Sequence, residues 1–297
     1  MFAAQAGQPR AYRSYDARVR VAPQRAFGPI ARPWQRDRRP PDMATVRPHA
    51  EPYYSGDGRL GVLVLHGFTG SPRSVRPWGE HLAGEGFRVA LPRLPGHGTT
   101  WQDLNTTTWE DWYGAAEKEF STLTASCDQV FIAALSVGSS LAFRLAEQYG
   151  EQVAGLSVVN PIVNQRDIRL RLLPWLRWVL PSFPGVINDI AKPGQDEGGY
   201  GRLPLDALYS LVLAGPQLRA DLPKVTSPLL IFRSNVDHVV DTTSLPLILS
   251  KVSSTDVTVV KLERSYHVAT MDHDAEEIFT RSSSFFRRLE KGRDGTH

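Results

Sequence analysis

One serine stands at a junction that favours nucleophilic chemistry. Ser136 lies between an apolar run at residues 130–135, which predicts a strand, and a stretch at 137–149, which predicts a helix. A serine on such a sharp turn is held out at the carboxyl edge of a sheet, above a helix N-terminus that favours a developing oxyanion. The string ALSVG (134–138) follows the nucleophile-turn pattern G-x-S-x-G, with alanine in place of the first glycine. A serine that merely caps the helix is the alternative interpretation.

Serine is a weak nucleophile without a base, so a histidine and an acid are needed at the same edge of the sheet. Asp237 follows an apolar run at 228–232, and His267 follows another at 257–262. Because the carboxyl ends of parallel strands meet at one edge, both side chains are expected near Ser136. His267 would then take the serine proton and later protonate the leaving group, while Asp237 would fix the imidazole tautomer and stabilise its charged form.

Other acids and histidines nearby are expected to have structural roles. Asp241 is expected to cap a helix at 242–252, and His238 is expected to point away from the site. The acids at the start of a final helix at 272–288 suit the dipole of that helix. The residues set aside in this way also include Asp272, Asp274, a solvated His273 and a half-exposed His81 within a helix.

The loop after the first buried strand supplies a second feature of nucleophilic catalysis. Residues 66–72 read HGFTGSP directly after the apolar run at 61–65. Glycines let the backbone approach a substrate closely, and N–H groups in such a turn can hold a negative oxygen. We therefore expect the backbone N–H groups of Phe68 and Val137 to form an oxyanion hole. A plain glycine turn would explain the glycines, but not the His-Gly pair beside a buried strand.

Strand and helix signals alternate from residue 43 onward, as in an α/β protein with a mostly parallel sheet and helices on both faces. The alternation stops between residues 161 and 205, where prolines and glycines are frequent. This predicts one α/β domain at 43–297 with a small cap inserted at about 161–205. The predicted strands are 61–65, 87–91, 130–135, 153–159, 228–232 and 257–262, and the predicted helices are 71–84, 109–122, 137–149, 170–180, 206–219, 242–252 and 272–288.

Five motifs together resemble the α/β-hydrolase group of bacterial monoacylglycerol lipases and related carboxylesterases. They span the chain from about residue 52 to residue 288, in the order of that group. The resemblance implies an α/β-hydrolase fold with an eight-stranded-type sheet and a small cap. The motifs are LVLHGFTGSP (63–72), LPRLPGHGTT (91–100), ALSVG (134–138), FRSNVDHVV (232–240) and SYHVATMD (265–272).

The same resemblance implies a reaction and a set of site residues. Ser136 would be the nucleophile, Asp237 and His267 its partners, and Phe68 and Val137 the oxyanion donors. The implied substrates are monoacylglycerols or other short- to medium-chain esters, hydrolysed in the cytoplasm through an acyl-enzyme, without a metal or organic cofactor. Relatives usually read G-L-S-x-G-G at the serine turn, whereas this chain has Ala134 and Ser139. The added methyl group of the alanine is expected to cost about 1 kcal/mol of strain, a tolerable amount that leaves open whether activity is reduced and does not imply its loss.

The predicted cap contains one apolar stretch, residues 170–180, with two arginines interspersed. Its apolar face is expected to pack on the body of the protein while the arginines face water. A sharper hypothesis places Trp175 and Trp178 in the pocket for the acyl chain. Transient contact of this surface with lipid is a further hypothesis, whereas stable membrane insertion is not expected.

Composition and charge exclude several other classes. A single cysteine, Cys127, makes no intramolecular disulfide, and no apolar run reaches the roughly 18 residues that span a bilayer. Residues 1–42 hold nine arginines and three aspartates, a net charge of +6, whereas the remaining 25 basic and 28 acidic residues give −3. The first segment is therefore interpreted as a disordered Arg/Pro-rich extension, with Met43 as the working start, and nucleic-acid binding is not expected.

Alternatives stay open at this point. The same three residues also serve acyltransferases, C–C hydrolases and cofactor-free haloperoxidases. A non-catalytic binding protein with this fold is a rival from another class, which the departures at Ala134 and Ser139 support. The retention of a serine, an acid and a histidine counts against it. The oligomeric state leaves no mark in the sequence.

Overall fold

The computed structural model describes residues 45–294, with side chains through residue 290. The predicted extension at 1–42 and the proposed start at Met43 lie outside the described residues. Within residues 45–294, no helix is both long enough and apolar enough to cross a membrane.

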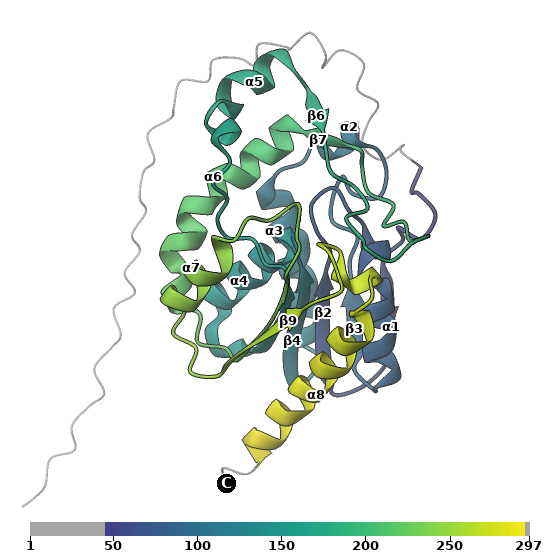
Figure 1. Cartoon of the computed structure of the whole chain (residues 1–297). Helices are drawn as coiled ribbons and strands as arrows, with labels where there is room; N and C mark the ends of the chain where they lie inside the picture. The colour runs from purple at the N-terminus through teal and green to yellow at the C-terminus, as the bar shows by residue number, and fades with distance from the viewer. Residues whose placement is uncertain (1–44, 295–297) are drawn as a thin grey trace, which may run out of the picture. The chain divides into compact units, whose positions relative to one another are not determined.

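A seven-stranded sheet forms the centre of the described region (Figure 1). Its strand order is β1-β3-β2-β4-β5-β8-β9. β1 runs antiparallel to β3, and every other neighbouring pair is parallel. All six residues of β2 are buried, as expected for a strand covered on both faces. The strands are β1 (Tyr53–Ser55), β2 (Leu60–Leu65), β3 (Arg88–Leu91), β4 (Gln129–Leu135), β5 (Val153–Val159), β8 (Leu229–Ser234) and β9 (Val257–Leu262).

The eight-stranded sheet implied by the resemblance is wrong for the described residues, whose central sheet has seven strands. The chain just before β1 runs as a loop. Pro48 and Pro52 have no N–H to donate to a neighbouring strand. The N–H of Arg47 instead donates to the carbonyl of Gly98 at 2.8 Å, in a loop beyond the end of β3.

Helices cover both faces of the sheet (Figure 1). α1 and α8 pack on one face, where Trp78 and Phe286 are fully buried in one hydrophobic cluster. α3, α4 and α7 cover the other face, where Phe143 and Ile248 belong to a second cluster. The helices are α1 (Arg76–Gly84), α2 (Trp101–Leu104), α3 (Trp109–Thr124), α4 (Val137–Tyr149), α5 (Leu173–Val179), α6 (Leu205–Asp221), α7 (Ser244–Lys251) and α8 (Ala275–Asp294).

Two predicted helices are interrupted by proline. The stretch 71–84 forms a short 3₁₀ helix at Pro72–Ser74 and then α1, whose first turn contains Pro77. The stretch 170–180 forms a 3₁₀ helix at Ile168–Arg171 and then α5, whose first turn contains Pro174. Proline fits the first turn of a helix because its missing N–H would have no partner there. Each of these two prolines therefore lies at the start of a new helix.

The segment between β5 and α6 interrupts the alternation, as predicted. It contains α5 and a two-stranded antiparallel hairpin of β6 (Ser182–Pro184) and β7 (Arg202–Pro204). α5 contacts α6, and both lie beyond the carboxyl ends of the central strands (Figure 1). We call residues 161–205 the insertion. The hairpin was not predicted, because strands of three residues show no measurable alternation.

Candidate active site

Ser136 occupies a strained turn between β4 and α4. Its φ and ψ angles of 55° and −122° lie in a region that side chains other than glycine rarely adopt. The turn is tight because α4 begins against the end of β2. A Cβ atom at Gly138 would lie 2.5 Å from the carbonyl oxygen of Leu65 and 2.7 Å from that of His66. The Ser136 hydroxyl makes no capping hydrogen bond to α4, so the capping interpretation is wrong.

The three residues predicted to meet at the sheet edge do meet. His267 Nε2 lies 2.9 Å from Ser136 Oγ, and His267 Nδ1 lies 3.2 Å and 3.1 Å from Asp237 Oδ2 and Oδ1. Ser136 follows β4, Asp237 follows β8, and His267 follows β9, so three strand ends bring them together. Both ring nitrogens of the imidazole are thereby engaged. This is the geometry of a nucleophile, a base and an acid that orients the base.

The Asp237 carboxylate is held as an anion. Its Oδ1 accepts the backbone N–H groups of Val239 and Val240 at 2.9 Å, and its Oδ2 pairs with Arg233 at 2.8 Å. Burial works against ionisation, but the hydrogen bond and charge of His267 and the two backbone N–H groups outweigh it. The pKa of Asp237 therefore lies below its usual value.

Asn160 ties the two late strand ends together, which the sequence did not indicate. It follows β5 with a positive φ of 45° and is fully buried. Its Oδ1 accepts the N–H of Ser234 at 2.8 Å, and its Nδ2 donates to the carbonyl of His267 at 2.8 Å. The side-chain amide of Asn160 therefore holds both the end of β8 and the loop that carries His267.

The backbone N–H groups of Phe68 and Val137 are the predicted oxyanion donors. Phe68 and Val137 both line the cavity that contains Ser136. No hydrogen bond from either N–H to a group within residues 45–294 is found. A Cβ atom at Gly67 would lie 3.2 Å from Ser136 Cβ, so the loop passes close to the serine. The predicted oxyanion hole stays a prediction, for which these two N–H groups are suitably free.

The buried His66 orients the Phe68 N–H. Its Nε2 accepts the N–H of Leu94 at 3.2 Å, so Nδ1 carries the proton and donates to the carbonyl of Gly67 at 3.0 Å. Burial lowers the pKa of His66 to about 4, which keeps the ring neutral. The Gly67 carbonyl and the Phe68 N–H belong to one trans peptide unit and point in opposite directions. Holding the carbonyl therefore sets the direction of the N–H.

The structure confirms only part of what was expected for the other acids and histidines near the site. Asp241 does not cap α7. It accepts the N–H of Thr243 at 2.8 Å and the N–H of Arg166 at 2.7 Å, because α7 begins only at Ser244. The expectation that His238 points away from the site is wrong, because His238 bonds Asp189 at 2.6 Å and lines the cavity, although it stays out of the serine–histidine–aspartate chain.

Asp272 and Asp274, the two acids just before α8, are buried and not exposed to solvent at the start of that helix. Asp272 accepts the N–H groups of Ala191 and Lys192, at 2.7 Å and 2.9 Å, and so fastens the insertion to the body of the protein. Asp274 accepts the N–H of Arg264 at 3.0 Å. His81 is half-buried in α1 and His273 is exposed, as expected from the sequence.

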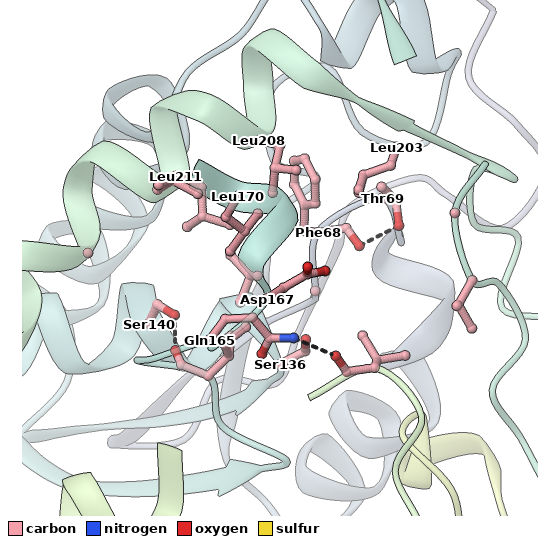
Figure 2. Close-up of a pocket in the computed structure, with 18 of the residues that line it drawn as sticks. Phe68, Thr69, Ser136, Ser140, Gln165, Asp167, Leu170, Leu203, Leu208 and Leu211 are labelled. Atoms are coloured by element: carbon pink, nitrogen blue, oxygen red, sulfur yellow. Dashed lines mark hydrogen bonds between the residues drawn. The ribbon is translucent and has the colours of Figure 1, made fainter. Parts of the chain in front are cut away.

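A cavity of about 1260 Å³ opens above Ser136. Leucines from the insertion and from α6 form much of its wall, and Figure 2 shows Leu170, Leu208 and Leu211 around the same cavity as Ser136. The wall also includes Leu173 and Leu176 on one side of α5. An acyl chain therefore has an apolar space beside the serine.

The placement of Trp175 and Trp178 in this pocket is wrong. Neither residue lines the cavity, and their exposed fractions are 69% and 46%. α5 turns Leu173 and Leu176, spaced one helical turn apart, toward the cavity. The two tryptophans lie on the outer side. Because Arg177 is the one polar residue of α5, the sequence of this helix did not show which side faces inward.

Two carboxylates of the insertion line the cavity and were missed from the sequence. Asp189 accepts the backbone N–H of His267 at 3.2 Å. Glu197 accepts the N–H of Asn188 at 2.8 Å, and burial raises the pKa of its carboxyl above the usual value. They lie in the proline- and glycine-rich part of the chain, where no periodicity marks a face. Within residues 45–294, no group of three or more His, Cys, Asp and Glu side chains is arranged to hold a metal ion.

Comparison with known proteins assigns the family. The sequence profile of Hydrolase_4, described as "Serine aminopeptidase, S33", matches residues 57–274. The chain belongs to this family of α/β-hydrolases. Proteins similar to this chain include a thermostable monoacylglycerol lipase from Bacillus sp. (strain H-257), 38% identical over 240 residues, which cover 80% of this chain and 95% of that protein. A carboxylesterase from Bacillus subtilis (strain 168) is 24% identical over 251 residues, covering 84% of this chain and all of that protein.

Solved structures agree with this family. A structure from work on the metagenome-derived lipolytic enzymes LipS and LipT is 39% identical, with a TM-score of 0.79, over 82% of this chain and 100% of that chain. A monoacylglycerol lipase from Paleococcus ferrophilus is 16% identical with a TM-score of 0.67, over 80% of this chain and 99% of that chain, and shows the shared fold alone. The protein is a serine ester hydrolase of the monoacylglycerol lipase and carboxylesterase type.

Proposed function

We propose that this hydrolase cleaves monoacylglycerols, and other short- to medium-chain carboxylic esters, through an acyl-enzyme on Ser136. The observation that carries the proposal is the chain of contacts from Asp237 through His267 to Ser136, at the floor of a large apolar cavity. The reaction needs no group beyond the side chains and backbone named here and one water molecule.

Acylation begins with the serine hydroxyl. Ser136 Oγ attacks the ester carbonyl carbon while its proton passes to His267 Nε2, 2.9 Å away. The carbonyl oxygen becomes an oxyanion, which accepts hydrogen bonds from the N–H groups of Phe68 and Val137. When this intermediate collapses, the carbon–oxygen bond to the alcohol breaks and the alcohol leaves with the proton from His267. The carboxylate of Asp237 stabilises the imidazolium in between.

Deacylation repeats these steps with water. His267 removes a proton from a water molecule, whose oxygen attacks the acyl carbon of the Ser136 ester. The same two N–H groups hold the second oxyanion. Collapse breaks the bond to Ser136 Oγ, which regains its proton from His267, and the carboxylic acid is released. The enzyme is unchanged, and ester plus water has become acid plus alcohol.

The two parts of the cavity support an amphipathic substrate. The leucines of α5 and α6 offer an apolar wall for the acyl chain, and 1260 Å³ exceeds the about 300–1,000 Å³ usual for small-molecule sites. Glu197 and Asp189 line the same cavity and offer hydrogen-bond acceptors to hydroxyl groups. A glycerol head with two free hydroxyls and one acyl chain has both properties.

We also propose that the enzyme works in the cytoplasm and meets its substrate by transient contact with lipid. The lone Cys127 fits a cytoplasmic location, because proteins there rarely rely on disulfides. Transient contact fits the exposed tryptophans of α5, since amphipathic surfaces of this kind bind reversibly to lipid.

Hydrolysis of a p-nitrophenyl ester series, together with a monoacylglycerol, tests the proposal. The wild-type protein is expected to hydrolyse both, and Ser136→Ala is expected to lose at least about 10³-fold in kcat/KM. An unchanged melting temperature of the variant serves as the control for folding. Amino-acyl p-nitroanilides are the comparison substrates, because the family description names an aminopeptidase. Faster cleavage of the anilides than of the esters would overturn the proposal.

A further inference from the structure

Asp189 reaches from the insertion to the two loops that carry the partners of Ser136. One oxygen of its carboxylate, Oδ2, accepts the backbone N–H of His238 at 3.1 Å and the backbone N–H of His267 at 3.2 Å. The other oxygen, Oδ1, lies 2.6 Å from His238 Nδ1. The main-chain carbonyl of Asp189 also accepts the N–H of Val268 at 3.0 Å. This one residue is therefore joined to the loops after β8 and β9.

The two N–H groups that share Oδ2 lie next to the Cα atoms of the acid and the base. The N–H of His238 belongs to the peptide unit that begins at the Cα of Asp237, and the N–H of His267 belongs to the unit that ends at its own Cα. A peptide unit is planar, so fixing its N–H restrains the Cα atoms at its two ends. Because both N–H groups converge on one oxygen, Asp189 sets the spacing between the backbones of Asp237 and His267.

His267 is held from both sides of its Cα atom. Asp189 accepts its N–H, and Asn160 Nδ2 donates to its carbonyl at 2.8 Å. Asn160 directly follows β5 of the central sheet, whereas Asp189 belongs to the insertion. The position of the base therefore depends on the insertion as well as on the strand ends.

The segment that presents the Asp189 carboxylate is itself fixed. Asp189 is only 8% exposed, and a buried carboxylate is costly unless it is hydrogen-bonded. Two backbone N–H groups and one imidazole nitrogen meet that need. Before it in the chain, Asn188 and Glu197 exchange two hydrogen bonds, at 2.8 Å and 2.9 Å. After it, the N–H of Ala191 donates to Asp272 at 2.7 Å.

We propose that Asp189 is a positioning residue, which sets the acid Asp237 against the base His267 during ester hydrolysis. It acts through the backbones of the two loops and takes no proton in the reaction. Residues 188–192 of the insertion are then part of the framework of the active site and not of a movable cover. The proposal rests on the roles proposed above for Asp237 and His267.

Steady-state kinetics of Asp189→Ala and Asp189→Asn on p-nitrophenyl butyrate test this inference. The substrate has no hydroxyl group for the Asp189 carboxylate to bind. Asp189→Ala is expected to lower kcat by about tenfold to 10²-fold with KM little changed, because a small displacement of the base slows proton transfer. Asp189→Asn keeps an oxygen that can accept both backbone N–H groups and is expected to recover most of kcat. A change in KM alone, or equal losses of kcat in the two variants, would overturn the proposal.

A background that lacks the acid separates positioning from a general structural effect. If Asp189 sets Asp237 against His267, it has little left to set once the acid is removed. In the Asp237→Ala protein, adding Asp189→Ala is therefore expected to lower kcat by less than about threefold, because residues that act as a unit are not additive. Losses of kcat that multiply would show that Asp189 acts independently of Asp237 and would overturn the proposal.

Asp196→Ala is the matched control from the same part of the insertion. Asp196 accepts the N–H of Gly198 at 2.9 Å and pairs with Arg73 at 3.4 Å, and among residues 45–294 it has no hydrogen bond or ion pair to the loops after β8 and β9. This variant is expected to keep the wild-type kcat and KM. A loss equal to that of Asp189→Ala would assign the effect to the insertion as a whole and overturn the proposal.

Two further measurements keep the outcomes distinct. The rates are expressed per site that a fluorophosphonate labels, so that unfolded protein in any variant does not count as slow enzyme. Ester hydrolysis by the wild type and its loss in Ser136→Ala report the proposed function separately. A wild-type kcat for Asp189→Ala beside an inactive Ser136→Ala would overturn this inference and leave the proposed function standing.

Discussion

Ser139 donates its hydroxyl proton to the carbonyl oxygen of Ala134, across a distance of 3.2 Å. These are the two positions at which this chain departs from the usual glycines of the serine turn. Both residues are fully buried, at the junction of β4 and α4. The bond links the end of β4 to the first turn of α4, and these two segments lie on either side of Ser136. The Ser139 hydroxyl therefore braces the strained turn through a backbone acceptor, which glycine at position 134 would also supply.

Removing this hydrogen bond should weaken the turn. Ser139→Ala is expected to lower the free energy of unfolding by about 1 kcal/mol, because the buried carbonyl loses a donor. Ser139→Gly is expected to cost more, since glycine adds conformational entropy to the unfolded chain. Urea denaturation measures both changes. Equal stability of Ser139→Ala and the wild type would show that the bond contributes nothing.

His66 should act as a positioning residue for the Phe68 N–H. His66→Leu removes the donor to the Gly67 carbonyl and is expected to lower kcat by about tenfold or more, with KM little changed, because an oxyanion donor acts mainly in the transition state. His66→Asn keeps an N–H donor near Nδ1 and should recover part of kcat. Steady-state kinetics on a p-nitrophenyl ester measures both. A change in KM alone would contradict this role.

The leucines of α6 should limit the length of the acyl chain. Leu211→Trp fills part of the cavity and is expected to raise KM for long-chain esters more than for short-chain esters. Trp175→Ala is the matched control, because its side chain faces away from the cavity. That control should leave KM for water-soluble esters unchanged at every chain length. Similar effects of both variants would show that the cavity does not set the chain length.

Glu147 should make stability depend on pH near neutrality. Burial raises its pKa in the folded protein to about 7, from an ordinary value of 4.5, although it pairs with Arg144 at 3.0 Å. Between these values the folded state binds more protons than the unfolded state, so this residue's contribution to stability falls as pH rises. Glu147→Gln removes the ionisation. Relative to the wild type, the free energy of unfolding of the variant should rise by up to roughly 3 kcal/mol as the pH increases from about 5 to about 8.

Urea titrations of both proteins at each pH measure that difference. The buried His66 and His97 titrate in wild type and variant alike, so their contributions cancel. A difference in unfolding free energy that stays constant with pH would show that Glu147 is already ionised in the folded protein throughout the range.

The central part of the site was predictable because it depends on strand ends. Ser136, Asp237 and His267 each follow a long apolar run, and parallel strands bring their carboxyl ends to one edge whatever the loops do. Periodicity located β4 and α4 to within one residue, since both are long and strongly apolar.

The residues that line the cavity were not predictable, because their positions do not depend on strand ends. Glu197 and Asp189 lie in a segment without periodicity, whose path is set by hydrogen bonds to distant residues such as Asp272. Trp175 was placed on the wrong side because a short helix with apolar residues at nearly every position does not reveal its inner face. β1 and the hairpin of the insertion escaped notice because each strand has only three residues.

Covalent labelling with a fluorophosphonate is the sharpest test of Ser136 as the nucleophile, because such probes react with an activated serine. The probe is added to the wild-type protein and to Ser136→Ala, and peptide mass spectrometry locates the label. We expect one label, on the peptide that contains Ser136, in step with the loss of ester hydrolysis, and no label on the variant. A label on another residue, or ester hydrolysis by Ser136→Ala at the wild-type rate, would contradict the assignment of Ser136.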